Sequence, residues 1–133
     1  MIDSILLLIK PKSTIAYLEE NQTLRQALEK MKYHGYTALP VINESGQYVG
    51  TVSEGDFLWN MISYGDNSIY DRENHRLSEI IRPDFNPPVK VTTPVEGLTD
   101  QIMNQNFVPV IDDQDVLMGI VTRQNVLRYL LKK

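Results

Sequence analysis

The chain has 133 residues and a mass of 15.3 kDa, and its 42% hydrophobic and 23% charged residues are typical of one compact domain or of two small halves that share a core. Its net charge of −4 disfavours duplex DNA or RNA as the main partner, because a nucleic-acid-binding surface normally carries a basic stripe. The absence of cysteine excludes disulfides, thiolate nucleophiles and cysteine-ligated metals, and two histidines, His34 and His75, are too few for most histidine-based metal sites. We therefore expect neither a cofactor nor a metal.

The N-terminal segment contains one apolar run, residues 5–9. It is much shorter than the roughly 20 apolar residues of a membrane-spanning helix, and it lacks the basic region and cleavage site of a signal peptide. We predict a short buried helix here, no membrane association and a cytoplasmic location.

The first half of the chain predicts the order β-α-β-β-α. A short extended segment at 14–18 precedes a helix whose apolar residues recur at helical spacing, with Thr23 as N-cap and Gly35 as C-terminal stop. Two strands follow at 37–42 and 49–52, separated by a polar turn, and a second helix spans 56–63. The polar stretch 64–75 then predicts an exposed linker.

The second half predicts the same order. An extended segment at 89–91 precedes a helix whose apolar side is Val95, Leu98, Ile102 and Met103. Strands are expected at 107–111 and 117–121, and a final helix at 125–131.

The two halves are an internal repeat. Leu39-Pro40-Val41-Ile42 and Gly50-Thr51-Val52-Ser53 recur as Val108-Pro109-Val110-Ile111 and Gly119-Ile120-Val121-Thr122, both 69 residues later. Upstream, Ile9-Lys10-Pro11 is echoed by Ile81-Arg82-Pro83 at an offset of 72, so about three residues are missing from the second half near its first helix. The division is therefore 1–63 for the first repeat, 64–75 for a linker and 76–133 for the second repeat. Neither repeat is large enough to bury its sheet alone, so we expect them to pack together as an α+β protein.

Each repeat places a hydroxyl side chain where a strand turns into a helix, Ser53 in the first and Thr122 in the second. Such a hydroxyl either caps the helix or donates to a phosphate placed over the helix N–H groups. Asp56, one turn further on, can accept two hydrogen bonds from a ribose diol or act as a cap. Arg123 is suited to phosphate oxygens, and a solvated surface arginine is the alternative.

The repeated pattern, Gly50-Thr51-Val52-Ser53-Glu54-Gly55-Asp56 and Gly119-Ile120-Val121-Thr122-Arg123-Gln124-Asn125 following the Pro40 and Pro109 strands, resembles the CBS domain, named after cystathionine β-synthase. Two tandem copies are similar to a Bateman module, and the resemblance covers about residues 5–131. It implies two β-α-β-β-α CBS repeats related by a pseudo-twofold axis, with two clefts between them. The family binds adenine nucleotides there, namely AMP, ADP, ATP, S-adenosylmethionine or cyclic di-AMP.

The resemblance assigns residues from both repeats to each cleft. The first cleft takes Thr14, Ile15, Ala16, Tyr36, Thr37, Ala38, Thr122, Arg123 and Asn125. The second cleft takes Ser53, Asp56, Asn86, Pro88, Asn106, Phe107 and Val108.

The two clefts differ in charge. The first has Asn125 where the family usually has Asp, and with Arg123 it is predicted to attract phosphate. The second keeps the ribose-binding Asp56, but Glu54 stands at the position of Arg123 and would repel a polyphosphate. The first cleft is similar to that of small stand-alone cyclic-di-AMP-binding CBS proteins of Gram-positive bacteria, except that Thr14 replaces a basic residue, for which nearby Lys12 is a candidate substitute.

Other classes fit less well. The sequence around Ser53 departs from a nucleophile elbow, and His34 and His75 fit a helix end and a polar linker, so no enzymatic activity is expected. The final helices carry excess apolar residues, which serve either the core or a homodimer interface: Phe57, Trp59, Met61, Ile62, Tyr129, Leu130 and Leu131. We therefore predict a regulatory sensor of AMP, ATP or cyclic di-AMP that forms a homodimer and signals to an unidentified effector protein. The alternative is a structural homodimeric interaction module without a ligand.

Overall fold

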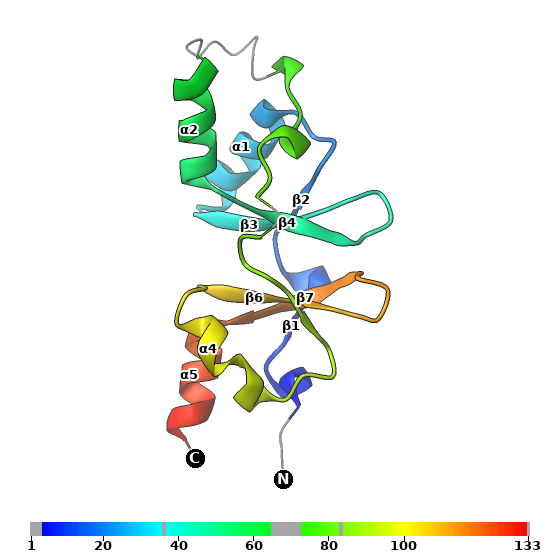
Figure 1. The fold of residues 1–133 in the computed structure, drawn as a ribbon, viewed down its shortest axis with the longest axis vertical. Helices are drawn as coiled ribbons and strands as arrows, with labels where there is room; N and C mark the ends of the chain where they lie inside the picture. Colours follow the sequence, from blue (N-terminus) through cyan, green and yellow to red (C-terminus); the bar gives the residue numbers. More distant parts are fainter. Residues whose placement is uncertain (1–3, 36, 65–72, 83, 133) are drawn as a thin grey trace. The chain divides into compact units, whose positions relative to one another are not determined.

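The computed structural model describes residues 4–35, 37–64, 73–82 and 84–132, and of residues 61–64 only the backbone. The chain divides into two compact units (Figure 1): unit 1 is Met1–Ile15 with Asn86–Lys133, and unit 2 is Ala16–Phe85. Each unit contains the predicted β-α-β-β-α order, which confirms the α+β class. The segment before each repeat packs with the unit of the other repeat. The boundaries 1–63, 64–75 and 76–133 stay a prediction about how the sequence repeats.

Unit 2 is built on a three-stranded sheet with the order β2-β3-β4. Its strands are β2 (Leu18–Glu19), β3 (Ala38–Ile42) and β4 (Tyr48–Ser53), with β2 parallel and β4 antiparallel to β3. Helices α1 (Leu24–His34) and α2 (Glu54–Tyr64) lie on the same face of this sheet (Figure 1). Both contribute to one core, which comprises Leu18, Leu24, Ala27, Met31, Leu39, Val41, Val52, Phe57 and Leu77.

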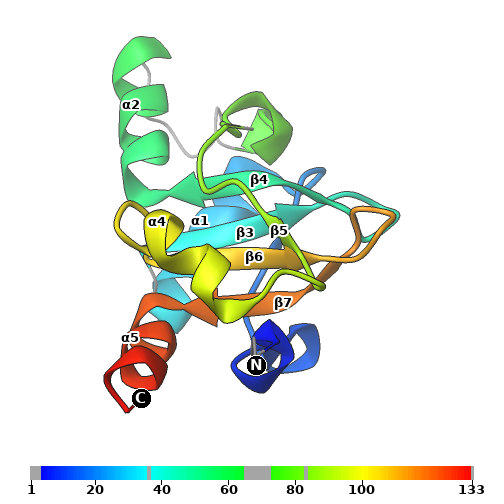
Figure 2. The same cartoon turned by 60° about the horizontal axis from the view of Figure 1, so that its bottom comes forward.

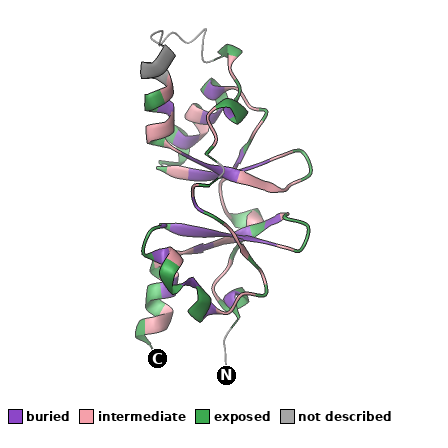
Figure 3. Ribbon diagram, in the orientation of Figure 1, coloured by how far each residue is buried: buried purple, intermediate pink, exposed green. Residues whose placement is uncertain are grey.

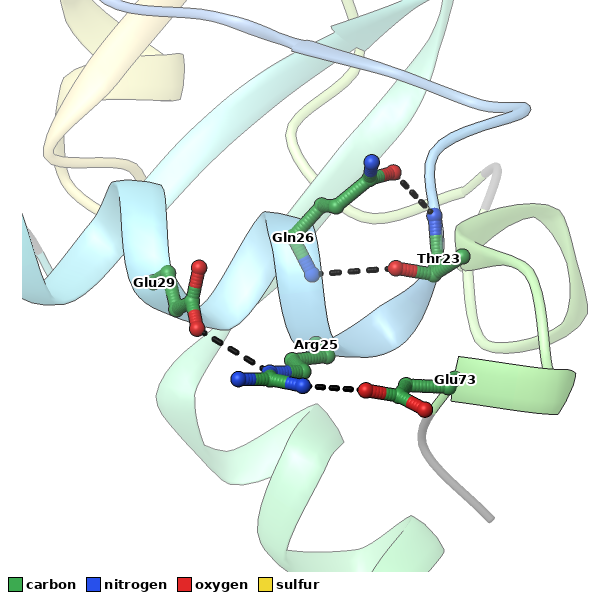
Figure 4. Close-up of polar contacts among 5 residues, drawn as sticks. All are labelled: Thr23, Arg25, Gln26, Glu29 and Glu73. Atoms are coloured by element: carbon green, nitrogen blue, oxygen red, sulfur yellow. Dashed lines mark hydrogen bonds and ion pairs between the residues drawn. The ribbon is translucent and has the colours of Figure 1, made fainter. Parts of the chain in front are cut away.

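Helix α1 begins and ends where the sequence predicts. The Thr23 hydroxyl accepts from the Gln26 N–H at 3.1 Å, and the Gln26 side chain accepts from the Thr23 N–H at 3.0 Å (Figure 4). This reciprocal capping satisfies two N–H groups that the first turn leaves without helical partners. At the other end Gly35 adopts φ 71°, a left-handed conformation that glycine takes without strain.

The described end of the predicted linker is fastened to α1. The guanidinium of Arg25 bonds to the carboxylates of Glu29 and Glu73 (Figure 4), and the Leu24 N–H donates to the His75 carbonyl at 3.0 Å. Beyond it lies the short 3-10 helix η3 (Leu77–Glu79). Residues 65–72 of the predicted linker lie outside the described residues.

Unit 1 is built on a four-stranded sheet with the order β1-β7-β6-β5. The central strands β6 (Phe107–Ile111) and β7 (Leu117–Thr122) run side by side (Figure 2), flanked by β5 (Val89–Lys90) and β1 (Lys10–Pro11). The 3-10 helix η4 (Val95–Leu98), helix α4 (Thr99–Ile102) and helix α5 (Arg123–Leu131) complete the repeat. Their core comprises Ile5, Val95, Leu98, Ile102, Val108, Val110, Val121 and Val126.

The two repeats agree residue by residue. Strand β3 pairs Ala38 with Ser53 and Leu39 with Val52, and β6 pairs Phe107 with Thr122 and Val108 with Val121. Both ladders shift register at the same place, between Val41 and Ile42 and between Val110 and Ile111. Figure 3 shows both β3 and β6 buried along almost their whole length. The offset of 69 residues is therefore confirmed as a structural equivalence.

The glycine of the repeated motif has a steric role in unit 1. Gly119 lies opposite Pro11 in the antiparallel β1–β7 pair. A Cβ atom at this position would lie 2.2 Å from the carbonyl oxygen of Lys10, so only glycine lets β1 approach β7 this closely.

Three sequence predictions are corrected. The N-terminal run is not a buried helix but the 3-10 turn η1 (Ile5–Leu7), in which Ile5 is buried and Leu6 and Leu7 are exposed, because a single turn presents only one residue to the core. The strand predicted at 14–18 shortens to β2, since residues 12–14 form the 3-10 turn η2 (Lys12–Thr14). Met103 follows the end of α4 and is 78% exposed, because the second repeat shortens its first helix.

The Tyr48 phenol holds the segment after η3 against β4. Its Oη lies 2.6 Å from the Thr51 hydroxyl and donates to the Phe85 carbonyl at 3.4 Å. Burial raises the pKa of Tyr48 to about 12, although the Thr51 hydrogen bond acts in the opposite direction.

We predict that Thr23→Ala lowers the free energy of unfolding by about 1 kcal/mol, because two N–H groups lose their capping arrangement. Thr23→Ser, which keeps the hydroxyl, should retain most of the stability. Urea denaturation of the three proteins followed by circular dichroism tests this. Equal stability of Thr23→Ala and the parent chain would contradict the capping role.

We also predict that stability falls in strongly alkaline solution. The folded state favours protonated Tyr48, so its contribution is complete below pH 10, the ordinary phenol pKa, and is lost as the pH rises to about 12. The difference between tyrosinate absorbance titrations of the parent chain and Tyr48→Phe should show one phenol titrating near pH 12. A difference centred on pH 10 would show that this phenol is not buried.

Candidate functional site

The same backbone bond forms the strand-to-helix junction in both units. The Glu54 N–H, at the start of α2, donates to the Thr37 carbonyl at 2.9 Å. In unit 1 the Arg123 N–H, at the start of α5, donates to the Asn106 carbonyl at 2.9 Å. Each helix start is thereby fixed beside the first residues of the neighbouring strand, where the sequence predicts ligand contacts.

In unit 2 the junction is acidic and closely bonded. The Asp56 carboxylate accepts through Oδ2 from the Ser53 N–H at 2.8 Å and from the Ser53 hydroxyl at 3.1 Å. The Asp56 side chain is only 8% exposed. The Asp56 carboxylate thus reaches back to the residue before α2, as in one half of a capping box, and the Ser53 hydroxyl acts as a donor.

Arg82 completes this junction, and the sequence predictions do not include it. Its Nε lies 2.6 Å from Asp56 Oδ1, and its Nη2 lies 3.3 Å from Asp56 Oδ2 and 3.4 Å from Ser53 Oγ. Arg82 also forms an isolated antiparallel bridge with Thr51 of β4. The sequence does contain a signal for the position of Arg82, because Ile81-Arg82-Pro83 repeats Ile9-Lys10-Pro11. Lys10 lies opposite β7, so the repeat predicts that Arg82 lies opposite β4.

In unit 1 the junction is cationic. The Thr122 hydroxyl accepts from the Asn125 N–H at 3.2 Å, so the structure assigns it a capping bond. The Arg123 Nε donates to the Ile102 carbonyl at 2.6 Å. This bond fixes the Arg123 side chain, for which the sequence allowed a solvated surface arginine as the alternative. This bond uses one of the five N–H donors of a guanidinium. The first turn of α5 contains no acidic residue, whereas that of α2 contains Glu54 and Asp56.

The other residues predicted for the first cleft divide between the units. Thr14 and Ile15 belong to unit 1, where η2 packs on β7, the strand that ends at Thr122. The Thr14 hydroxyl donates to the Pro11 carbonyl at 2.8 Å. Ala16, Thr37 and Ala38 belong to unit 2. Tyr36 lies outside the described residues.

The residues predicted for the second cleft divide in the same way. Ser53 and Asp56 belong to unit 2, and the remaining ones belong to unit 1: Asn86, Pro88, Asn106, Phe107 and Val108. The unit 1 residues come from two segments, 86–88 and 106–108. The side-chain amide of Gln105 links these segments, because it donates to the Phe107 carbonyl at 3.2 Å and to the Pro87 carbonyl at 3.4 Å.

Val108 is fully buried in the core of unit 1, so a ligand would reach only its backbone. Each predicted cleft takes residues from both units, so the two clefts remain predictions.

The histidines occupy structural positions. His34 is the last residue of α1. His75 Nδ1 lies 2.9 Å from the Glu79 carboxylate, and hydrogen bonds from the Arg76 N–H and from His75 lower the pKa of Glu79.

Other parts of the described chain offer less. A surface hollow of about 440 Å³ in unit 2 is lined by Glu20, Asn21, Arg76 and Ser78, of which Arg76 already donates to the Asn21 carbonyl, and it contains none of the predicted ligand contacts. Within the described ranges no cluster of three or more His, Asp or Glu side chains is placed to hold a metal ion. Among those same residues, no helix has the length and apolar character needed to cross a bilayer.

Comparison with known proteins shows two matches to the family model of the CBS domain, at residues 8–63 and 77–132. The chain is 25% identical over 118 residues to cyclic di-AMP receptor B of Bacillus subtilis (strain 168), covering 89% of this chain and 80% of the receptor. It is also 32% identical over 114 residues to the A-adding tRNA nucleotidyltransferase of Aquifex aeolicus (strain VF5), covering 84% of this chain but only 12% of that enzyme.

Solved structures show the same fold. The crystal structure of CbpB in complex with c-di-AMP has a TM-score of 0.88 at 21% identity, covering 98% of this chain and 86% of that one. The structure of CBSX2 in complex with AMP has a TM-score of 0.78 at 24% identity, covering 98% of this chain and 97% of that one.

Proposed function

This chain belongs to the CBS domain family, and from that premise we propose that it is a regulatory sensor that binds an adenine nucleotide in a cleft between its two repeats and signals to an effector protein. The observation that carries the proposal is the junction at Thr122, Arg123 and Asn125. It combines the N-terminus of the nine-residue helix α5 with a fixed guanidinium and no acidic residue in the first turn. Helix dipole and guanidinium both favour phosphate at this junction.

Among adenine nucleotides, cyclic di-AMP fits the first predicted cleft best. Its two riboses are linked through their 3′ oxygens, so it presents no free 2′,3′-diol, and Asn125 has no carboxylate to grip one. The similarity of this chain to cyclic di-AMP receptor B supports cyclic di-AMP as the ligand. The similarity of its fold to CBSX2 in complex with AMP supports the broader class of adenine nucleotides. Binding would favour one arrangement of the repeats over another, and the effector would read that shift in population.

We predict that cyclic di-AMP at one hundred times its Kd stabilises the chain by about 2.7 kcal/mol, which raises the melting temperature by roughly 10 °C. AMP, ATP and S-adenosylmethionine, measured beside it by thermal shift, should give smaller increases. If none of the four raises the melting temperature, the sensor function is wrong and an interaction module without a ligand is the better account.

Arg123→Ala should weaken cyclic di-AMP binding by about 10- to 100-fold, because a hydrogen bond to a charged group contributes about 1.5–3 kcal/mol. Arg128→Ala, on the exposed side of the same helix, is the matched control and should bind like the parent chain. Calorimetry measures both constants. Equal affinity for Arg123→Ala and the parent would remove Arg123 from the binding site.

A homodimer is a second proposal, favoured by exposed apolar side chains on the last helix of each repeat. In α2, Leu58 is 56% and Trp59 67% exposed, and in α5, Leu127 is 44% and Leu131 83% exposed. Of the residues for which the sequence left the core and an interface open, Phe57 is buried in the core of unit 2, and Tyr129 and Leu130 pack against the core of unit 1. The side chains of Met61 and Ile62 lie outside the described ones. Exposed apolar side chains that are neighbours on one helix, as Leu58 and Trp59 are and as Leu127 and Leu131 are, form the kind of patch that marks protein interfaces.

We expect light scattering to give twice the chain mass of 15.3 kDa for the parent, and a single chain mass for Trp59→Ser combined with Leu131→Ser. Tyr33→Ser, which changes an 86% exposed residue of α1, is the control and should stay dimeric. A monomeric parent chain at micromolar concentration would contradict the dimer.

A further inference from the structure

We propose that Arg82 is a built-in occupant of the Ser53–Asp56 junction, which closes the second predicted site to the ribose of a nucleotide. The inference rests on the proposed nucleotide binding and concerns the number of nucleotides bound per chain. While Arg82 is in place, the junction of α2 contributes no nucleotide site. Arg82 is thus a specificity-determining residue that acts by exclusion.

The acceptor capacity of Asp56 is the first argument. An ionised carboxylate offers about four lone-pair positions on its two oxygens. Oδ2 accepts from three donors, the Ser53 N–H at 2.8 Å, the Ser53 hydroxyl at 3.1 Å and the Arg82 Nη2 at 3.3 Å, and Oδ1 lies 2.6 Å from the Arg82 Nε. One position on Oδ1 is left, whereas a ribose diol binds such a carboxylate through two O–H donors, so both hydroxyls can bind only if Arg82 leaves.

The strength of the contact is the second argument. The guanidinium meets the carboxylate at two points, and charge-assisted hydrogen bonds of this kind are roughly twice as strong as neutral ones. The incoming hydroxyls carry no charge. The exchange of Arg82 for a ribose therefore keeps hydrogen bonds to the carboxylate but removes its ion pair, at a side chain that is only 8% exposed.

The anchoring of Arg82 is the third argument. Its side chain is 52% exposed, but its backbone bridges to Thr51, and its guanidinium lies 4.1 Å from the centre of the Phe85 ring. The Phe85 N–H donates to the Arg82 carbonyl at 3.2 Å, and the Phe85 carbonyl accepts from Tyr48. Arg82 is therefore held at the junction from its backbone and its side chain.

The other repeat lacks this arrangement. The bridge between Lys10 and Ile120 is the equivalent of the bridge between Arg82 and Thr51, so Lys10 takes the place of Arg82. Asn125 takes the place of Asp56 and carries no charge with which Lys10 could form an ion pair. The closing ion pair therefore belongs to one repeat only, and the junction of α5 stays open to an anion.

The test counts AMP, which carries a free ribose diol, by calorimetry on the full chain. Arg82→Gln should bind one more AMP per chain than the parent, and Asp56→Asn added to it should remove that extra site. Arg25→Gln, which changes an exposed arginine bound to other carboxylates of unit 2, is the control and should match the parent. Cyclic di-AMP, which lacks the diol, should bind the parent and Arg82→Gln with equal stoichiometry.

The outcomes separate this inference from the proposed function. If cyclic di-AMP binds the parent but Arg82→Gln gains no AMP site, only the role of Arg82 is wrong. If the extra site survives Asp56→Asn, it does not use this carboxylate and the role is also wrong. Should Arg82→Gln fail to fold, NMR of the parent chain decides. The chemical shift of the Arg82 Nε–H should not change on saturation with AMP. A change to the chemical shift of an arginine without an ion-pair partner would overturn the proposal.

Discussion

The junction where the last strand of each repeat turns into its last helix determines where the residues proposed to meet phosphate and ribose lie. One backbone hydrogen bond, from Glu54 to Thr37 in one unit and from Arg123 to Asn106 in the other, ties the helix start to the neighbouring strand. The antiparallel ladders behind these bonds share their register and their irregularity. The scaffold is thus the same twice, and only the side chains at the junction distinguish the two repeats.

Those side chains have diverged in charge. The junction of α2 carries Glu54 and Asp56, and its carboxylate is neutralised from within its own unit by Arg82. The junction of α5 carries Arg123, fastened by one bond to Ile102, and no acidic residue in its first turn. A duplicated fold of this kind can keep one binding position and convert the other into a structural contact, because a change at one junction leaves the packing of the other unit intact.

Much of the fold follows from the sequence because it depends on local patterns and on a repeat. The capping of α1 by Thr23 and the stop at Gly35 need only a few neighbouring residues, and the strands follow from the matched motifs around Pro40 and Pro109. The fate of Leu6 and Leu7 could not be predicted, because a single 3-10 turn has no periodicity that shows which residue faces the core.

The candidate site is less predictable. The residues at each junction follow from the motif, but the contact between Arg82 and Asp56 joins positions 26 residues apart through a segment whose path is set by tertiary packing. The bond from Arg123 to Ile102 likewise depends on where the shortened helix α4 ends.

The exchange of the N-terminal strand has a consequence for how the chain is made. Unit 2 is one continuous stretch, so a ribosome can release all of it before β7 of unit 1 is made. Unit 1 takes β1 from residues 10–11 and β7 from residues 117–122, so its sheet closes only after β7 has left the ribosome. Until then β1 lacks its partner strand. Deletion of β1 would therefore destabilise unit 1, which contains the second repeat, although β1 lies at the start of the first repeat in sequence.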